Sequence, residues 1–122
     1  MTALTFALAA LGCGCGSVLR FWVGTFRRPH HLPWPTFAVN VLGTALLGAA
    51  ASLSDKGHLS AAGAFIVGGG VAGGLTTFST LAVDAVVLWR ASRWRAVAYV
   101  AITAVAGVAA GYFGWFMAGA AA

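Results

Sequence analysis

The chain has 122 residues, of which 61% are hydrophobic and only 7% are charged, and its mean hydropathy is +0.92. Soluble domains carry roughly 25% charged residues, so this composition excludes a soluble catalytic domain and indicates an integral membrane protein. The formal net charge is +5, but the basic residues stand at the ends of apolar runs. They are therefore interpreted as signals of membrane topology, and no nucleic-acid partner is expected.

The first apolar run predicts a membrane span at about residues 2–23. Gly12 and Gly16 form a small-xxx-small pair, which permits close helix contact in lipid. Cys13 and Cys15 would point to different faces of a helix, which argues against a mutual disulfide. Both cysteines are expected to be small, buried packing residues.

A second span is predicted at about residues 34–53, and its one strongly polar side chain is Asn40. An amide in hydrocarbon is costly unless it bonds to another helix or faces a polar path. The residues alone leave both alternatives open.

The third apolar run, at about residues 59–89, is longer than one crossing requires. A helix of that length would reach about 45 Å, whereas a bilayer core of roughly 30 Å needs about 20 residues. Glycines cluster in its middle, and Thr76, Thr77, Ser79 and Thr80 follow them. The run therefore predicts a helix broken near residues 73–77, whose exposed backbone groups form an ion site. The alternative is a Gly/Thr-rich packing face for a neighbouring helix.

A fourth span is predicted at about residues 96–118, where Tyr99 and Thr103 are neighbours on one helix face. These two side chains could line a polar path or bond across helices. The fold class is therefore an all-α integral membrane protein, a single domain of four transmembrane helices with the third broken at its centre. So few Gly/Ala-rich helices cannot easily enclose a conduit, and an oligomer is expected.

Three segments carry a more specific pattern. Residues 12–21 are glycine-rich and end in Arg20 beside an aromatic ring, residues 35–43 surround Asn40, and residues 73–80 read GGLTTFST. In this order, on a four-span chain of this length, they resemble the Fluc fluoride channel family (CrcB type). The resemblance covers essentially the full length, and the third segment is the family's most distinctive signature.

The resemblance implies a passive fluoride-selective ion channel, and not an enzyme, that exports cytoplasmic fluoride across the inner (plasma) membrane. It implies a dimer of two subunits inserted in opposite orientations, with a structural sodium ion held by the backbone carbonyls of Gly73 and Thr76. Arg20 belongs to the family motif and is assigned a structural role. The fluoride path it implies is lined by Asn40, Phe78, Ser79, Thr80, Leu81, Tyr99 and Thr103.

Leu81 is the position where the chain departs from the family pattern, which usually has a second phenylalanine there. If that ring edge helps fluoride through, a pore built on Leu81 is weakened or silent.

The charges between the predicted spans are unevenly distributed. If the first and third loops share a side of the membrane, that side holds five arginines and the opposite side has only Lys56 close to the membrane. These five are Arg27, Arg28, Arg90, Arg93 and Arg95. Such a bias predicts a fixed orientation with the first and third loops in the cytoplasm. The second subunit is then an oppositely oriented paralogue, and the alternative is a second copy of this chain.

Two other functions compete with the channel. A small-multidrug-type coupled exporter needs a membrane-embedded carboxylate, and Asp84 is the only candidate in the four runs. It lies toward an interface. A non-transporting membrane assembly protein would need only the helix-packing residues, and Asn40 and the hydroxyls of residues 76–80 count against it.

Overall fold

The computed structural model describes residues 1–27 and 32–122, and across both ranges every regular element is a helix. The elements are α1 (Ala3–Gly24), α2 (Trp34–Asp55), α3 (Ala61–Ala64), η1 (Phe65–Ala72, a π-helix), α4 (Gly73–Leu75), α5 (Phe78–Ala91) and α6 (Arg93–Ala121). Elements α3 to α5 together form the third span. The prediction of an all-helical fold is confirmed for the described residues.

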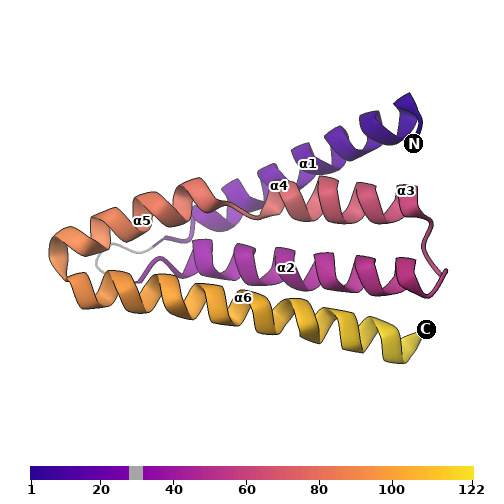
Figure 1. The fold of residues 1–122 in the computed structure, drawn as a ribbon. Coiled ribbons are helices and arrows are strands. Elements are labelled where there is room, and N and C mark those ends of the chain that lie inside the picture. Colours follow the sequence, from indigo (N-terminus) through magenta and orange to yellow (C-terminus); the bar gives the residue numbers. More distant parts are fainter. Residues whose placement is uncertain (28–31) are drawn as a thin grey trace.

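Four helices of the described chain are long and apolar enough to cross a membrane: Ala3–Gly24, Trp34–Asp55, Ala61–Ala91 and Arg93–Ala121. The ranges expected from the sequence lie within three residues of these bounds at every end. Figure 1 shows both chain ends and the α2–α3 connection at one end of the bundle, and the α5–α6 corner at the other. The first and third loops therefore share a side.

Local side-chain bonds set where several helices begin. Thr2 and Thr5 form a reciprocal capping pair at the start of α1, and the Ser92 hydroxyl accepts from the Arg95 N–H at the start of α6. Pro35 lies in the first turn of α2, where its missing N–H has no helical partner to lose. Each device satisfies or removes backbone groups that a helix end would leave unpaired.

Glycines let the helices approach at backbone distance. A Cβ added at Gly16 or Gly74 would overlap backbone atoms across the contact between α1 and the third span. The same is true of Gly48 and Gly114 at the contact between α2 and α6. Lipid supplies no hydrophobic drive between helices, so close packing of this kind holds them together. The two main pairings are α1 with η1 and α4, and α2 with α6.

The third span is broken as predicted, but its glycines do not make the break. Residues 68–74 stay helical within η1 and α4. The chain leaves the helix at Thr76 (φ −74°, ψ 155°) and Thr77 (φ −152°, ψ 119°), and α5 begins at Phe78. The Thr77 hydroxyl caps α5 by accepting from the Thr80 N–H at 3.2 Å. The glycines serve helix contact, and the polar residues after them form the break.

Both cysteines of α1 are free thiols on exposed positions of the single chain. The expectation that Cys13 and Cys15 are buried is therefore wrong. The reason is the register of α1: its contact face carries Gly16 against the third span, which turns the cysteine side chains away from that contact.

Candidate functional site

Asn40 of α2 bridges the break in the third span. Its side-chain oxygen accepts from the Thr77 N–H at 2.7 Å, and its Nδ2 donates to the Thr77 carbonyl at 3.1 Å. The N–H can bond only to an acceptor, which assigns the oxygen end of the amide. Asn40 thus bonds to another helix, which is one of the two alternatives that the sequence left open. A place for Asn40 on an ion path stays a prediction.

The break frees carbonyl groups at the end of α4. In an unbroken helix the Thr77 N–H would donate to the Gly73 carbonyl, but that N–H is taken by Asn40. The Thr76 carbonyl likewise loses its helical donor, because the Thr80 N–H turns to the Thr77 hydroxyl. The Gly73 and Thr76 carbonyl oxygens are therefore among those that stand outside the helical ladder.

Helix α1 supplies two donors to the same segment. Arg20 Nη1 donates to the Thr76 carbonyl at 2.9 Å, and the Ser17 hydroxyl donates to the Gly74 carbonyl at 3.4 Å. A carbonyl oxygen has two lone pairs, so Thr76 keeps one acceptor position beside the guanidinium. Arg20 ties α1 to the break.

A cluster of hydroxyls lies at the start of α5. The Thr77 hydroxyl is 3.1 Å from the Thr80 hydroxyl and 3.2 Å from the Ser79 hydroxyl. Thr77 is buried, whereas Ser79 and Thr80 are exposed in the single chain. The site therefore presents neutral donors whose protons can rotate toward an ion.

Phe78 and Leu81 have different surroundings, although both belong to the first turn of α5. Phe78 is 81% exposed. Leu81 is partly buried and packs against the cluster formed by Leu88, Ala96 and Tyr99. The chain's own core thus uses Leu81 and leaves the Phe78 ring uncovered.

Tyr99 and Thr103 of α6 are buried. The Thr103 hydroxyl donates to the Tyr99 carbonyl at 2.7 Å within the helix, and the Tyr99 hydroxyl donates to Asp84 Oδ2 at 3.4 Å. Tyr99 therefore bonds across helices, to α5. An ion track along these two residues stays a prediction.

Asp84 is the centre of a polar cluster that the sequence did not predict. Its side chain is 2% exposed, accepts from the Thr36 hydroxyl at 2.7 Å and forms an ion pair with Arg27. These two partners lie 48 and 57 positions away along the chain, beyond the reach of any spacing rule. The one available signal was that Asp84 is the only acidic residue in the four apolar runs.

A polar cavity of about 520 Å³ lies between α1, α2 and α5. It extends from the break at Thr77 to Asp84, toward the end of the bundle that holds the first and third loops. Its polar lining consists of Ser17, Arg20, Thr25, Arg27, Thr36, Thr77, Thr80 and Asp84. Irregular backbone at membrane depth is tolerated where it borders such a hollow.

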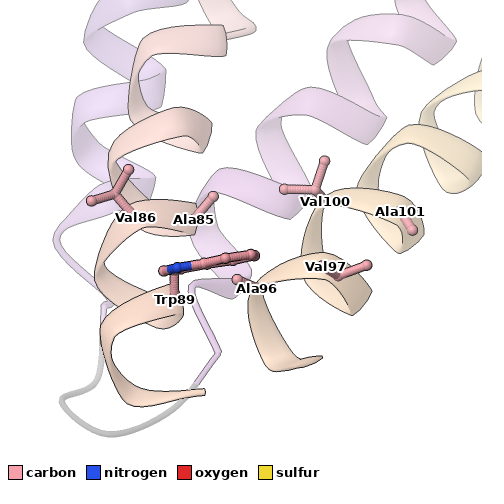
Figure 2. Close-up of a pocket in the computed structure, with 7 residues that line it drawn as sticks. All are labelled: Ala85, Val86, Trp89, Ala96, Val97, Val100 and Ala101. Carbon is pink, nitrogen blue, oxygen red and sulfur yellow. The ribbon is translucent and has the colours of Figure 1, made fainter. Parts of the chain in front are cut away.

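A second hollow, between α5 and α6, has a different chemistry. Figure 2 shows Trp89 facing Ala96 across it, with valines and alanines making up the rest of the wall. None of its seven lining residues carries a charge or a hydroxyl. Its one polar side-chain group is the Trp89 indole N–H, whereas the cavity beside the break offers several hydroxyls and two arginines and is therefore the candidate site.

The fold and the site together define a small four-span membrane protein whose broken helix borders a polar cavity. The family model described as CrcB-like protein, Camphor Resistance (CrcB), matches residues 7–115. The chain therefore belongs to this family, as the three sequence segments indicated.

Curated relatives agree along most of the chain. A Rhodococcus jostii protein named fluoride-specific ion channel FluC 2 is 38% identical over 92% of this chain and 96% of its own length. A Thermobifida fusca protein named fluoride-specific ion channel FluC 1 is 37% identical over 93% of this chain and 99% of its own length. A Renibacterium salmoninarum protein named fluoride-specific ion channel FluC is 33% identical, covering 84% of this chain and 90% of that protein.

Proposed function

We propose that this protein is a passive fluoride-selective channel that exports fluoride from the cytoplasm. The observation that carries the proposal is the break at Thr76–Thr77, which is fixed by Asn40 and opens on a cavity lined by hydroxyls and arginines. Its relatives over most of the chain are named fluoride-specific ion channels. A passive route needs no coupling carboxylate, and Asp84 is already paired with Arg27.

The donors at the break suit a small, strongly hydrated anion. Fluoride must exchange its water for other hydrogen-bond donors, and the site offers hydroxyls and the Asn40 amide. One N–H of that amide bonds to Thr77, and its second N–H takes no part in that bridge. The edge of the Phe78 ring is electropositive and adds a weak contact. The hydroxyls, the Asn40 amide and the ring edge carry no net charge, so these groups admit the ion without trapping it.

A second subunit of opposite orientation completes the path in this proposal. Ser79 and Thr80 are exposed in the single chain, where lipid would offer their hydroxyls no partner beyond Thr77, and the Phe78 ring beside them is uncovered. The helix face around the break is therefore proposed as the dimer contact, with fluoride passing along it. Asn40, Tyr99 and Thr103 extend the polar lining.

The same face is proposed to hold a structural sodium ion. Sodium prefers oxygen ligands, and the Gly73 carbonyl is released from its helical bond while Thr76 keeps one free lone pair. One chain offers too few oxygens, so the equivalent carbonyls of the second subunit would complete the set. When bound, the ion supplies a fixed positive charge that joins the two broken spans.

The orientation of the subunit is proposed to be fixed. Arg27, Arg90, Arg93 and Arg95 stand at the end of the bundle opposite both chain ends, and Arg28 lies outside the described residues. On the other side Lys56 donates to the Gly119 carbonyl at the end of α6. Basic residues favour the cytoplasmic face of the inner membrane. An oppositely oriented paralogue is then the second subunit.

Fluoride efflux from liposomes tests the function. Vesicles containing either the purified chain or the complex co-purified from its native membrane are loaded with potassium fluoride or potassium chloride, and a potassium ionophore balances the charge. We expect fast fluoride efflux and negligible chloride efflux. Equal chloride efflux, or no fluoride efflux from either preparation, overturns the proposal.

Two further measurements test the finer parts. A C-terminal tag carrying reporters active on opposite sides of the membrane should report the outside only, and equal signals reject a fixed orientation. Replacing sodium by a large organic cation during purification should lower fluoride efflux, and restoring sodium should recover it. Unchanged efflux through both steps rejects the sodium site.

A further inference from the structure

The ion pair between Arg27 and Asp84 lies at the loop end of the polar cavity, and both residues line it. Asp84 comes from α5 and has a side chain that is 2% exposed, whereas Arg27 follows the end of α1 and has a side chain that is 48% exposed. The pair joins a buried anion to a cation that reaches in from the surface.

Among residues 1–27 and 32–122, the carboxylate contacts no other cation. Thr36 donates to Asp84 Oδ2 at 2.7 Å and Tyr99 donates to the same oxygen at 3.4 Å, but both donors are neutral. The other arginine in the described lining of the cavity, Arg20, donates to the Thr76 carbonyl at the break. Within the part of the chain that the structure describes, Arg27 is therefore the residue that offsets the charge of Asp84.

An unpaired carboxylate at this place would oppose the passage of an anion. Asp84 is the one acidic residue in the cavity lining, and its burial limits screening by water and salt. Removing one partner of a buried ion pair leaves an uncompensated charge, which has a larger effect than removing both partners.

We propose that Arg27 is a positioning residue for conduction: its guanidinium neutralises Asp84 at the loop-side mouth of the cavity, so that fluoride can pass a buried carboxylate. This inference rests on the proposed function, because it concerns the rate at which that anion passes. It assigns to a loop arginine a role beyond membrane topology.

Single and double neutralisation separate this role from a structural one. Arg27→Gln leaves Asp84 uncompensated, and we expect fluoride efflux to fall by about tenfold. Arg27→Gln combined with Asp84→Asn removes both charges and should restore efflux to within about threefold of the wild type. Arg27→Lys keeps the charge and should retain most of the efflux. If the pair only tied α5 to the first loop, the double variant would be as impaired as the single one.

Arg90→Gln is the matched control for topology. It removes one arginine from the same side of the membrane, and Arg90 is an exposed residue in the last turn of α5 that does not line the cavity. We expect wild-type efflux from it. Each variant is compared at equal amounts of folded protein, checked by gel filtration and the unfolding midpoint.

The possible outcomes test the role of Arg27 separately from the proposed channel function. Absence of efflux from the wild-type chain and its native complex overturns the proposed function. Wild-type efflux that is unchanged in Arg27→Gln, or a double variant no better than that single variant, overturns the role of Arg27 alone.

Discussion

The two main helix pairings of this protein both pack through glycines, but only one of them contains a broken helix. In the pair α2–α6, Gly48 and Gly114 bring two uninterrupted helices to backbone contact. In the pair formed by α1 with the third span, Gly16 and Gly74 do the same, yet the span breaks two residues after Gly74. Glycine density therefore indicates close contact in this protein, and the break requires a polar partner for the backbone groups it releases.

The largest effect on fluoride efflux is expected at Asn40, which supplies the polar partner for the break in the third span. Asn40→Asp places a fixed negative charge at the break and removes the donor to the Thr77 carbonyl. We expect fluoride efflux from liposomes to fall by roughly 100-fold, because the charge repels the anion in a poorly screened site.

Thr44→Val is the control for that change. Thr44 lies one turn further along α2, and its hydroxyl donates to the Asn40 backbone carbonyl at 2.6 Å, within the same helix. We expect efflux within about twofold of the wild type, because no bond to the third span is lost. Equal losses in the two variants would show that efflux reports the condition of α2 in general.

Glycine substitutions test whether the two pairings are equally tight. Gly74→Ala and Gly114→Ala each force a methyl group into facing backbone, so each should lower the free energy of unfolding by about 1–3 kcal/mol. Denaturant titration in mixed micelles measures this. Only Gly74→Ala should also lower efflux per folded protein, since it displaces the segment beside the break.

Gly14→Ala provides the reference for the glycine series. A methyl group there meets nothing within 4 Å in the single chain. We expect a stability change within about 0.5 kcal/mol. A loss as large as that of Gly74→Ala would locate an additional contact on the outer face of α1.

Removing a helix cap should lower stability by a smaller amount, and by more at the break than at the third loop. Thr77→Val removes the cap of α5 at the break, and Ser92→Ala removes the cap of α6 at the third loop. We expect a loss of about 1–2 kcal/mol for the first and about 0.5–1 kcal/mol for the second, because water can replace a cap only at the membrane surface. Unfolding midpoints of the two variants measure the difference, and the reverse order would contradict a buried break.

At Phe78 we expect little effect on stability. Phe78→Leu should leave the free energy of unfolding within about 0.5 kcal/mol, because the ring is 81% exposed in the single chain, while fluoride efflux falls severalfold. Leu81→Phe should instead cost about 1–3 kcal/mol by overpacking the cluster around Leu88. Unchanged efflux in Phe78→Leu would remove the ring from the path.

The sequence predicted the four spans closely, because each is an apolar run of membrane-crossing length. It also placed the break between residues 73 and 77, although it attributed the break to glycine. Structure shows the extended residues to be Thr76 and Thr77, held by Asn40. The prediction that Cys13 and Cys15 are buried was wrong because the sequence does not give the rotation of α1 about its axis.

What the sequence determined by itself is the class of the protein: hydropathy, loop charge and three ordered motifs define a four-span chain of the CrcB-like family. The tertiary structure alone decided which polar groups meet. The Asn40–Thr77 bridge joins residues 37 positions apart, and the Arg27–Asp84 pair joins residues 57 positions apart. Such pairs depend on the rotation and depth of whole helices. A local glycine pattern indicates that a helix packs closely, but it does not specify which helix it meets or in which register.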